Sequence, residues 1–217
     1  MLNNIMIINN QFDNIQLKSS SLLECFDNIE WKKNISLSMW VNKYASIIHS
    51  SKVDYEIETN QENWESDFFF LCPINENTPS SIRLNFKIKH SWIKLNVHIV
   101  ALVSENAPVT IDANIIMEEW IKWSSASLLE ESILLSPNVN IKSLPVLDIH
   151  AKNIQASHWA KLYRLDDDKL FYLESKWLNK NQAEKLILSS FWERMFSLVE
   201  INEKEKEWLL DKFFTYC

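Results

Sequence analysis

Apolar and polar residues alternate most regularly over residues 82–103, where the apolar positions switch from even to odd numbers around His90 and Ser91. If these two residues formed the tip of an antiparallel hairpin, the apolar side chains of both strands would share one face. A slip of one residue would expose the whole set, so the register would be well defined. His-Ser is a poor two-residue turn without glycine, and a four-residue loop with the same pairing fits equally well. The facing pairs would be Ile88 and Ile93, Phe86 and Leu95, Leu84 and Val97, and Ile82 and Ile99.

The same kind of pattern predicts shorter strands around this hairpin. Residues 53–57 alternate, residues 67–72 form a more continuous apolar run, and residues 109–111 fit an edge strand. Residues 35–50 fit both a helical period and an alternating one. We favour a helix there and leave the strand open as the alternative.

Helical spacing and capping residues predict the remaining elements of the first part of the chain. Ser21 and Glu24 form a capping box for a short helix. Asn114 would cap a long helix over residues 114–135, which Pro137 ends. The apolar face of this long helix would consist of Met117, Ile121, Ser124 and Leu128, with Trp120 beside them.

The last third of the chain predicts a second hairpin and two helices. Residues 159–165 and 170–174 would pair through a turn of three aspartates. The helices would begin at Asn181 and Asn202, each followed three residues later by a glutamate. Leu188, Phe191, Trp192, Met195 and Val199 would form the apolar side of the first of these helices.

Together these elements predict an α+β fold. Its antiparallel sheet would have the hairpin 82–103 at its centre and would pack against the helix 114–135 and the two C-terminal helices. The expected units are residues 1–136 and residues 137–217, packed together as one globule. No internal repeat is apparent in the sequence.

Composition narrows the possible functions, because the 217 residues include no glycine and ten tryptophans. Without glycine the chain has no Walker A loop, dinucleotide fingerprint, nucleophile elbow or EF-hand turn. Left-handed turn positions are expected at Asn and Asp instead. Residues with AT-rich codons are enriched as a group, so the ten tryptophans run against a codon bias and are expected to serve a purpose.

Charge and cysteine content indicate the compartment and the partner. The formal net charge of −7 disfavours nucleic acid and favours a basic protein partner. No apolar stretch is long enough for a membrane span, and the start of the chain lacks the basic region of a signal peptide. The odd set Cys25, Cys72 and Cys217 suggests neither disulfides nor a C-x-x-C metal site, so we expect a cytoplasmic protein without a cofactor.

One segment resembles the PD-(D/E)xK nucleases, whose two carboxylates hold a metal while a lysine positions water. Asp168, Glu174 and Lys176 would fill these roles. In the expected hairpin, however, Asp168 and Glu174 are about 20 Å apart along one strand, and Glu174 faces Lys161 as an ordinary ion pair. The five histidines, His49, His90, His98, His150 and His158, lack partners at metal-ligand spacing, so no metal site is expected.

Tryptophans in polar surroundings and a basic strip are the candidate partner-binding residues. Trp123, Trp64 and Trp31 lie among charged and polar residues, which suits interface anchors. Trp92 lies beside a strip that includes Arg83, Lys87 and Lys94, together with Lys89 and His98. This strip is also compatible with the solvated face of a half-buried sheet.

These features favour a non-enzymatic, intracellular bacterial protein that binds another protein. The leading hypothesis is an immunity protein that inhibits a cognate toxin by occlusion, because acidic charge steers association with basic enzymes. One alternative is an adaptor, chaperone or structural subunit of a bacterial secretion or anti-phage defence assembly. The other is the metal-dependent nuclease described above.

Overall fold

A computed structural model describes the backbone of residues 4–8, 14–17, 21–25, 31–37, 41–48, 52–59, 64–74, 79–104, 108–198 and 203–216. Side chains are described for residues 34–35, 43–48, 52–59, 64–74, 79–104, 108–198, 203–204 and 206–211. These residues form thirteen strands followed by three helices.

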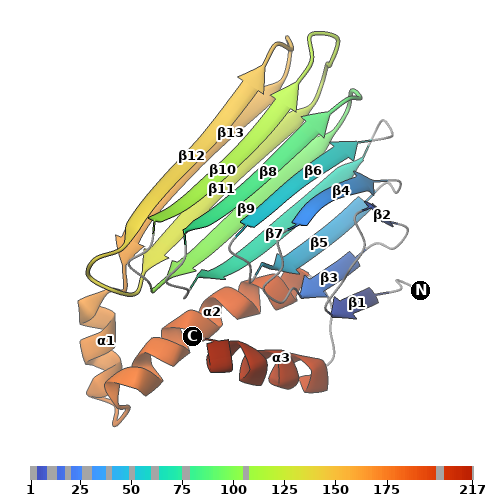
Figure 1. Ribbon diagram of the computed structural model, residues 1–217. Helices are drawn as coiled ribbons and strands as arrows, with labels where there is room; N and C mark the ends of the chain where they lie inside the picture. Colours follow the sequence, from blue (N-terminus) through green and yellow to red (C-terminus); the bar gives the residue numbers. More distant parts are fainter. Residues whose placement is uncertain are drawn as a thin grey trace.

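The chain forms a parallel β-solenoid of two facing sheets, in which successive strands alternate between the sheets (Figure 1). Every strand pair is parallel. The seven-stranded sheet contains β1 (Asn4–Ile8), β3 (Ser21–Cys25), β5 (Val41–Ile47), β7 (Glu65–Ile74), β9 (Lys94–Val103), β11 (Ser125–Leu134) and β13 (Gln155–Arg164). The six-stranded sheet contains β2 (Asn14–Leu17), β4 (Trp31–Leu37), β6 (Lys52–Thr59), β8 (Ser80–Ile88), β10 (Pro108–Met117) and β12 (Asn140–Ile149).

Each strand therefore pairs with the equivalent strands of the preceding and following coils. Ile82 pairs with Ile111, 29 positions later, and Ile111 pairs with Ser143, 32 positions later. Alternate side chains point between the sheets and stack on their counterparts in the next coil. The alternation in the sequence thus marks the strand face that points between the sheets.

Aromatic rings fill the space between the two sheets. Phe68, Phe70 and Tyr44 of the seven-stranded sheet meet Phe86 and Tyr55 of the six-stranded sheet, and the ring centroids lie 5.2 to 6.2 Å apart. All five side chains are at most 2% exposed. Burying each ring contributes about 2 to 3 kcal/mol to folding, so this cluster anchors the central coils.

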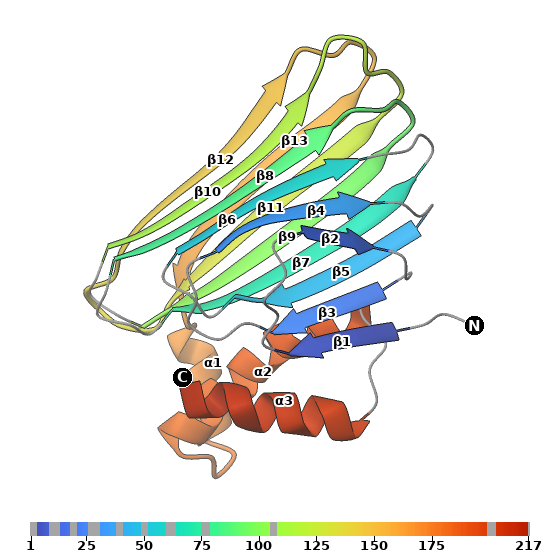
Figure 2. The same cartoon turned by 45° about the vertical axis from the view of Figure 1, so that its right-hand side comes forward.

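Three helices follow the last strand: α1 (Asp167–Glu174), α2 (Lys180–Leu198) and α3 (Glu203–Tyr216). Helix α2 lies across the outer face of the seven-stranded sheet (Figure 2). There Phe191, Trp192 and Met195 pack against Phe69 and Leu71 of β7. The molecule thus has two apolar layers, one between the sheets and one beneath the helices.

The predicted α+β fold with an antiparallel sheet is wrong. The hairpin 82–103 does not exist, because β8 and β9 belong to different sheets and residues 89–93 form the corner between them. A hairpin and a solenoid corner both produce a change of apolar positions from even to odd numbers. In both cases the apolar residues of two successive strands point into the same core. Hydrogen bonds to the neighbouring coils replace the expected pairing.

Three predicted helices are strands in the structure. The helix 114–135 is replaced by parts of β10 and β11 joined by a corner, the helix near Ser21 by β3, and the helix favoured over residues 35–50 by parts of β4 and β5. Met117, Ile121 and Leu128 are all buried, as the helical spacing required. Met117 is buried at the end of β10, Ile121 in the corner after it and Leu128 in β11.

Other local predictions are confirmed. Residues 53–57 and 67–72 lie in β6 and β7, and residues 109–111 lie in β10. The edge position predicted for residues 109–111 is wrong, because β10 lies between β8 and β12. Both C-terminal helices are present, although Asn179 rather than Asn181 caps α2 through reciprocal hydrogen bonds with Gln182. Val199 and Asn202 lie outside the described residues.

The expected second hairpin is wrong, and a repeat was missed. Residues 170–174 belong to α1, which Asp166 caps by accepting hydrogen bonds from the backbone N–H groups of Asp168 and Lys169. The coils repeat the same strand-corner-strand unit without recognisable sequence similarity. Strands β12 and β13 continue both sheets past residues 136–137, where the sequence places a unit boundary.

Candidate docking surface

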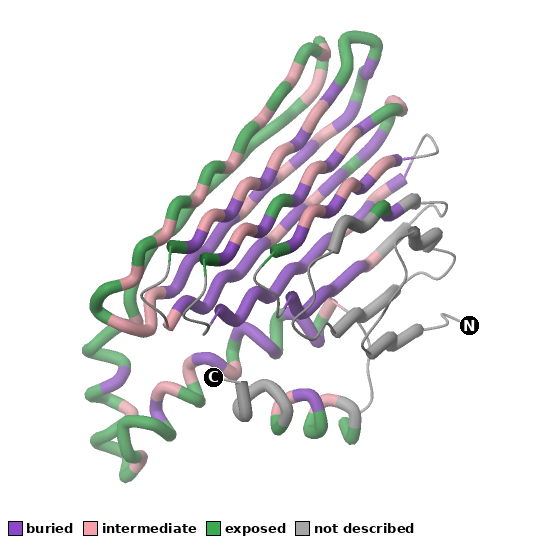
Figure 3. The backbone as a smooth tube through the Cα atoms, in the orientation of Figure 1, coloured by how far each residue is buried: buried purple, intermediate pink, exposed green. Residues whose placement is uncertain are grey.

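The solenoid ends at two long strands that each have only one neighbour among the described residues. β12 pairs with β10, and β13 pairs with β11, over ten residues each. Figure 3 shows that these two strands are far less buried than the strands of the central coils. We call β12 and β13 the open end. An unpaired edge offers a row of backbone donors and acceptors to another strand.

Apolar side chains accompany this unpaired backbone. Leu162 is 60% exposed, although its register partner Ser132 is buried, because no further coil covers it. Trp159 is 67% exposed on the same strand, and Leu144 and Val146 of β12 are also exposed. These side chains lie on different faces, because Leu162 continues the face between the sheets whereas Trp159, Leu144 and Val146 point outward from their sheets. Exposed apolar side chains beside a free strand edge are typical of an interaction site.

Exposed apolar side chains are also present on α1 and in the turn after it. Phe171 and Tyr172 are exposed, and Trp177 is 97% exposed. Trp177 also has a positive φ of 70°, which costs a bulky residue about 1 to 2 kcal/mol. A strained and fully exposed tryptophan does not stabilise the fold, so its location suits an anchor for a partner.

A cluster of charged residues fixes β13 and α2 to the sheet. The Glu131 side chain on β11 is only 5% exposed and accepts hydrogen bonds from Lys161 Nζ (3.1 Å) and Arg194 Nη1 (2.8 Å). His98 Nε2 lies 2.8 Å from the same carboxylate. Because these partners come from β13, α2 and β9, one carboxylate joins three elements at the base of the open end.

Titration of this cluster follows from its surroundings. Burial raises the pKa of Glu131, but the hydrogen bonds from His98, Lys161 and Arg194 outweigh it and hold the pKa below its ordinary value. Burial lowers the pKa of His98, so its imidazole is neutral at pH 7 and donates from Nε2. The lowered pKa of Glu131 means that its carboxylate stabilises the fold at neutral pH and loses this effect in acid, and the lowered pKa of His98 makes protonation in acid a further cost to the fold.

We expect Glu131→Gln to lower the free energy of unfolding by about 2 kcal/mol at pH 7. Breaking a fully buried ion pair costs more, but Lys161 and Arg194 are each about half exposed. Urea denaturation at pH 7 and in acid measures the effect, and the wild-type and variant curves should converge as the pH falls below the ordinary carboxyl pKa. An equal difference at both pH values would contradict the assignment.

A second carboxyl group lies between the sheets, next to the open end. Glu130 is 2% exposed and accepts a hydrogen bond from the Ser143 hydroxyl, while its Oε1 atom has no partner. Burial raises the pKa of Glu130 to about 7, against the opposing effect of Ser143. Burial also raises the pKa of the Cys72 thiol, and a thiol held protonated is a poor metal ligand.

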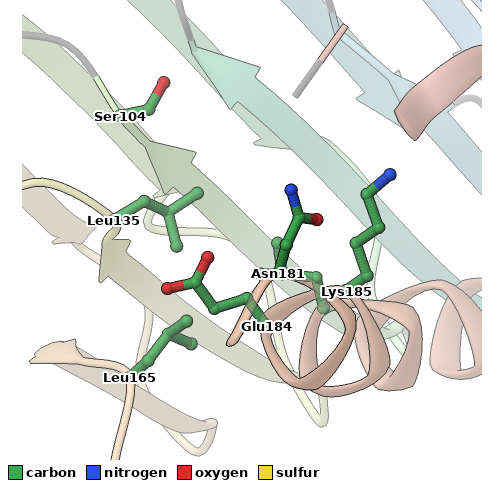
Figure 4. Close-up of a pocket in the computed structure, with 7 residues that line it drawn as sticks. Ser104, Leu135, Leu165, Asn181, Glu184 and Lys185 are labelled. Carbon is green, nitrogen blue, oxygen red and sulfur yellow. The ribbon is translucent and has the colours of Figure 1, made fainter. Parts of the chain in front are cut away.

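A depression of about 320 Å³ lies where α2 passes the ends of β9, β11 and β13. Leu135, Leu165 and Leu188 provide its apolar lining, and the Glu184 carboxylate extends between the first two in the view of Figure 4. Its mixed lining of leucines and charged groups suggests no particular ligand.

The nuclease residues do not converge in the structure. Asp168 and Glu174 lie near opposite ends of α1, and Lys176 follows the helix. The expected ion pair between Glu174 and Lys161 is absent, because Lys161 binds Glu131 instead. Within the described part of the chain, no group of three or more His, Cys, Asp or Glu residues is placed to hold a metal ion.

The predicted basic strip is divided between two faces and paired with acids. Arg83 and Lys87 of β8 lie on the outside of the six-stranded sheet, where Lys87 Nζ is 2.7 Å from Glu56 and Arg83 is 3.8 Å from Asp112. Lys94 of β9 pairs with Glu65 at 2.5 Å. These pairs link successive coils and leave no continuous cationic surface.

The four candidate tryptophans have different environments. Trp64 is 3% exposed, whereas Trp92 and Trp123 are more than half exposed and stack on each other. Trp31 begins β4, and its side chain lies outside the described ones. Trp159, Trp177 and Glu131 were not singled out in the sequence, although the alternation over residues 155–164 could have identified Trp159 as lying on one face of a strand.

Comparison with known proteins assigns this architecture to a family. Residues 43–191, more than half of the chain, match the family model described as "SUF system FeS cluster assembly, SufBD core domain". The chain belongs to the SufBD core-domain family. This membership overturns the hypotheses of an immunity protein, of a secretion or defence subunit and of a nuclease.

Several curated proteins are similar to this SufBD chain. It is 24% identical over 141 residues to the iron-sulfur cluster assembly SufBD family protein slr0076 of Synechocystis, covering 65% of the chain and 31% of that protein. It is 26% identical to the chloroplastic protein ABCI7 of Arabidopsis thaliana, covering 57% and 26%. It is 28% identical over 68 residues to the iron-sulfur cluster assembly protein SufD of Escherichia coli, covering 31% and 16%. The chain thus spans less than a third of the length of these relatives.

The predicted protein partner agrees with membership of a cluster assembly family. Among the helices in the described residues, none is sufficiently long and apolar to span a bilayer. Neither the composition nor a short motif in the sequence indicates this family, because the coils of the solenoid do not resemble one another in sequence.

Proposed function

We propose that this SufBD chain is a non-enzymatic scaffold subunit of iron–sulfur cluster assembly, and that its open end docks another SufBD solenoid. The supporting observation is the pair of ten-residue edge strands, each with one neighbour among the described residues, together with the exposed Trp159 and Leu162 on β13. The iron–sulfur cluster is the cargo of the assembled complex.

A second solenoid is the partner that best fits two neighbouring strand edges. Its own end would present two edges at the same spacing, so both sheets could continue across the interface. In a twofold arrangement like edges pair antiparallel, and each protein buries the other's apolar side chains. The net charge of −7 favours a partner with a basic surface, and the free thiol of Cys72 suits a reducing compartment such as the cytoplasm.

The test replaces one apolar residue at the open end by a charged one. With a second copy of the chain as the partner, we expect the wild type to form a dimer in sedimentation velocity experiments at micromolar concentrations. Leu162→Glu should weaken this association by at least about 2 kcal/mol, because the new carboxylate would be buried in the interface.

Leu186→Glu is the matched control, since Leu186 is 51% exposed and lies on α2 and not on β12 or β13. This control should dimerise as the wild type does, and both variants should retain the circular dichroism of the wild type. A wild-type chain that stays monomeric, or equal weakening by both substitutions, would contradict the proposed docking.

A further inference from the structure

Three exposed tryptophans gather on the corners that lead from the six-stranded to the seven-stranded sheet. Trp92 lies between β8 and β9, and Trp120 and Trp123 lie between β10 and β11. They are 53%, 64% and 58% exposed. These corners lie at the edge of the solenoid away from the helices (Figures 1 and 2). We call the three residues the tryptophan shelf.

The backbone places two of these indoles in register. Trp92 N donates to Lys122 O, and Trp123 N donates to Asn153 O in the following coil. The rings of Trp92 and Trp123 consequently stack, with centroids 5.7 Å apart and planes inclined by 22°. Because both backbones are held by the next coil and the rings stack, the pair forms an aromatic platform.

Folding stability does not account for this arrangement. Trp92 and Trp123 have positive φ angles of 62° and 56°, which cost bulky residues about 1 to 2 kcal/mol each. Their mutual stacking contributes only about 0.5 to 1.5 kcal/mol. Asn153 occupies the equivalent position of the next coil with φ of 58°, a conformation that asparagine adopts more easily. The exposed indoles therefore have a use other than holding the corner.

A depression of about 470 Å³ adjoins the platform. Besides Trp92 and Trp123, it is lined by Ser124, Ser125, Asn153, Ile154 and Gln155. None of these side chains is charged. Hydroxyl, amide and indole groups supply hydrogen-bond donors, and within the described part of the chain neither indole N–H of the pair has a partner.

An uncharged ligand with acceptors and aliphatic rings fits this lining. A proline-rich segment in the polyproline II conformation offers solvated carbonyl groups and ring faces that stack on tryptophan. Nucleic acid or an anionic bilayer would need cations in the depression. The depression has no charged lining residue, and the exposed Lys122 between Trp120 and Trp123 is accompanied by Glu118 and Glu119.

We propose that the tryptophan shelf and its depression bind a proline-rich segment of a partner protein in an extended conformation. Proline rings stack on the indoles of Trp92 and Trp123, while Asn153, Gln155 and the indole N–H groups donate to peptide carbonyls. The site lies at the corners of the coils and is separate from the unpaired edges of the open end. Its occupation does not require docking of a second solenoid.

The test is a titration of the full chain, labelled with ¹⁵N at the indole nitrogens, with an acetylated decaproline peptide. We expect saturable shifts of the Trp92 and Trp123 indole signals at millimolar peptide or below. Trp123→Asn keeps a residue that tolerates the left-handed backbone and should weaken binding at least tenfold. Trp159→Ala, which removes an equally exposed indole from β13, should leave the affinity unchanged.

Several results would overturn the proposal. The first is the absence of saturable shifts, and the second is an equal response to a glycine-serine peptide of the same length. Stronger binding to cellohexaose or to phosphatidylcholine–phosphatidylserine vesicles would assign the platform to a sugar or to a membrane instead. We expect the Leu162→Glu variant, by contrast, to bind decaproline as the wild type does, because the tryptophan shelf is separate from the open end.

Discussion

Replacing Glu130 by Gln should raise the free energy of unfolding at pH 8 by about 2 to 3 kcal/mol. Burial between the sheets raises the pKa of this carboxyl to about 7, from an ordinary value of 4.5. At pH 8 the folded chain must hold a buried carboxylate, and each unit of pKa shift corresponds to about 1.4 kcal/mol. Gln keeps an acceptor for the Ser143 hydroxyl and carries no charge.

The difference in free energy of unfolding between the wild type and Glu130→Gln should also depend on pH. A folded-state pKa above the unfolded value stabilises the protein fully below pH 4.5, and the effect is lost as the pH rises through about 7. Denaturation at pH 5 and pH 8 should therefore show a large difference between wild type and Glu130→Gln only at pH 8. Glu118→Gln, at an exposed position, is the control. An unchanged stability at pH 8 would contradict the buried, shifted carboxyl.

The second large effect is expected from Trp192→Ala, which should lower the free energy of unfolding by about 4 kcal/mol. Trp192 is 1% exposed and packs with Phe196 between α2 and the seven-stranded sheet. Its removal leaves a cavity against Phe69 and Leu71 of β7. Chemical denaturation followed by circular dichroism measures the loss.

Trp177→Asn is the matched control for this substitution, since Trp177 is almost fully exposed and strained at φ of 70°. The control should be as stable as the wild type or slightly more stable. Equal losses from Trp192→Ala and Trp177→Asn would contradict the docking of α2 by Trp192.

The sequence predicted which residues are buried better than it predicted how strands pair. Alternation correctly marks residues 53–57 and both arms of 82–103 as strands with one face in the core between the sheets. It carries no information on the partner strand, and here that partner lies about 30 positions away in the next coil. The C-terminal helices were predictable because caps and helical spacing are local signals.

The error over residues 114–135 has a specific cause. Ile121 is buried in a corner, and its distance from Met117 and Leu128 imitates one face of a helix. The corners between strands were also hard to recognise, because the chain has no glycine to mark them. Left-handed positions expected at Asn and Asp are occupied by Trp92, Trp123 and Trp177 as well as Asn153.

Residues of the candidate site were predictable only where they depend on their immediate surroundings. Trp123, identified from its polar neighbours, and Trp92, identified beside the basic strip, are exposed, whereas Trp64 among similar polar neighbours is buried. Glu131 binds groups 30, 33 and 63 positions away, so no local pattern could reveal its role. The exposure of Leu162 depends on β13 being the last strand of its sheet among the described residues.

Amide hydrogen exchange at the open end tests the central claim most directly. The chain is followed by mass spectrometry at a dilute and a concentrated condition, with its own second copy as the partner. If β12 and β13 dock another solenoid, peptides from Asn140–Ile149 and Gln155–Arg164 will exchange more slowly when concentrated, while β8 to β11 stay unchanged. Exchange that is independent of concentration, or protection confined to other strands, would contradict a docking role for the open end.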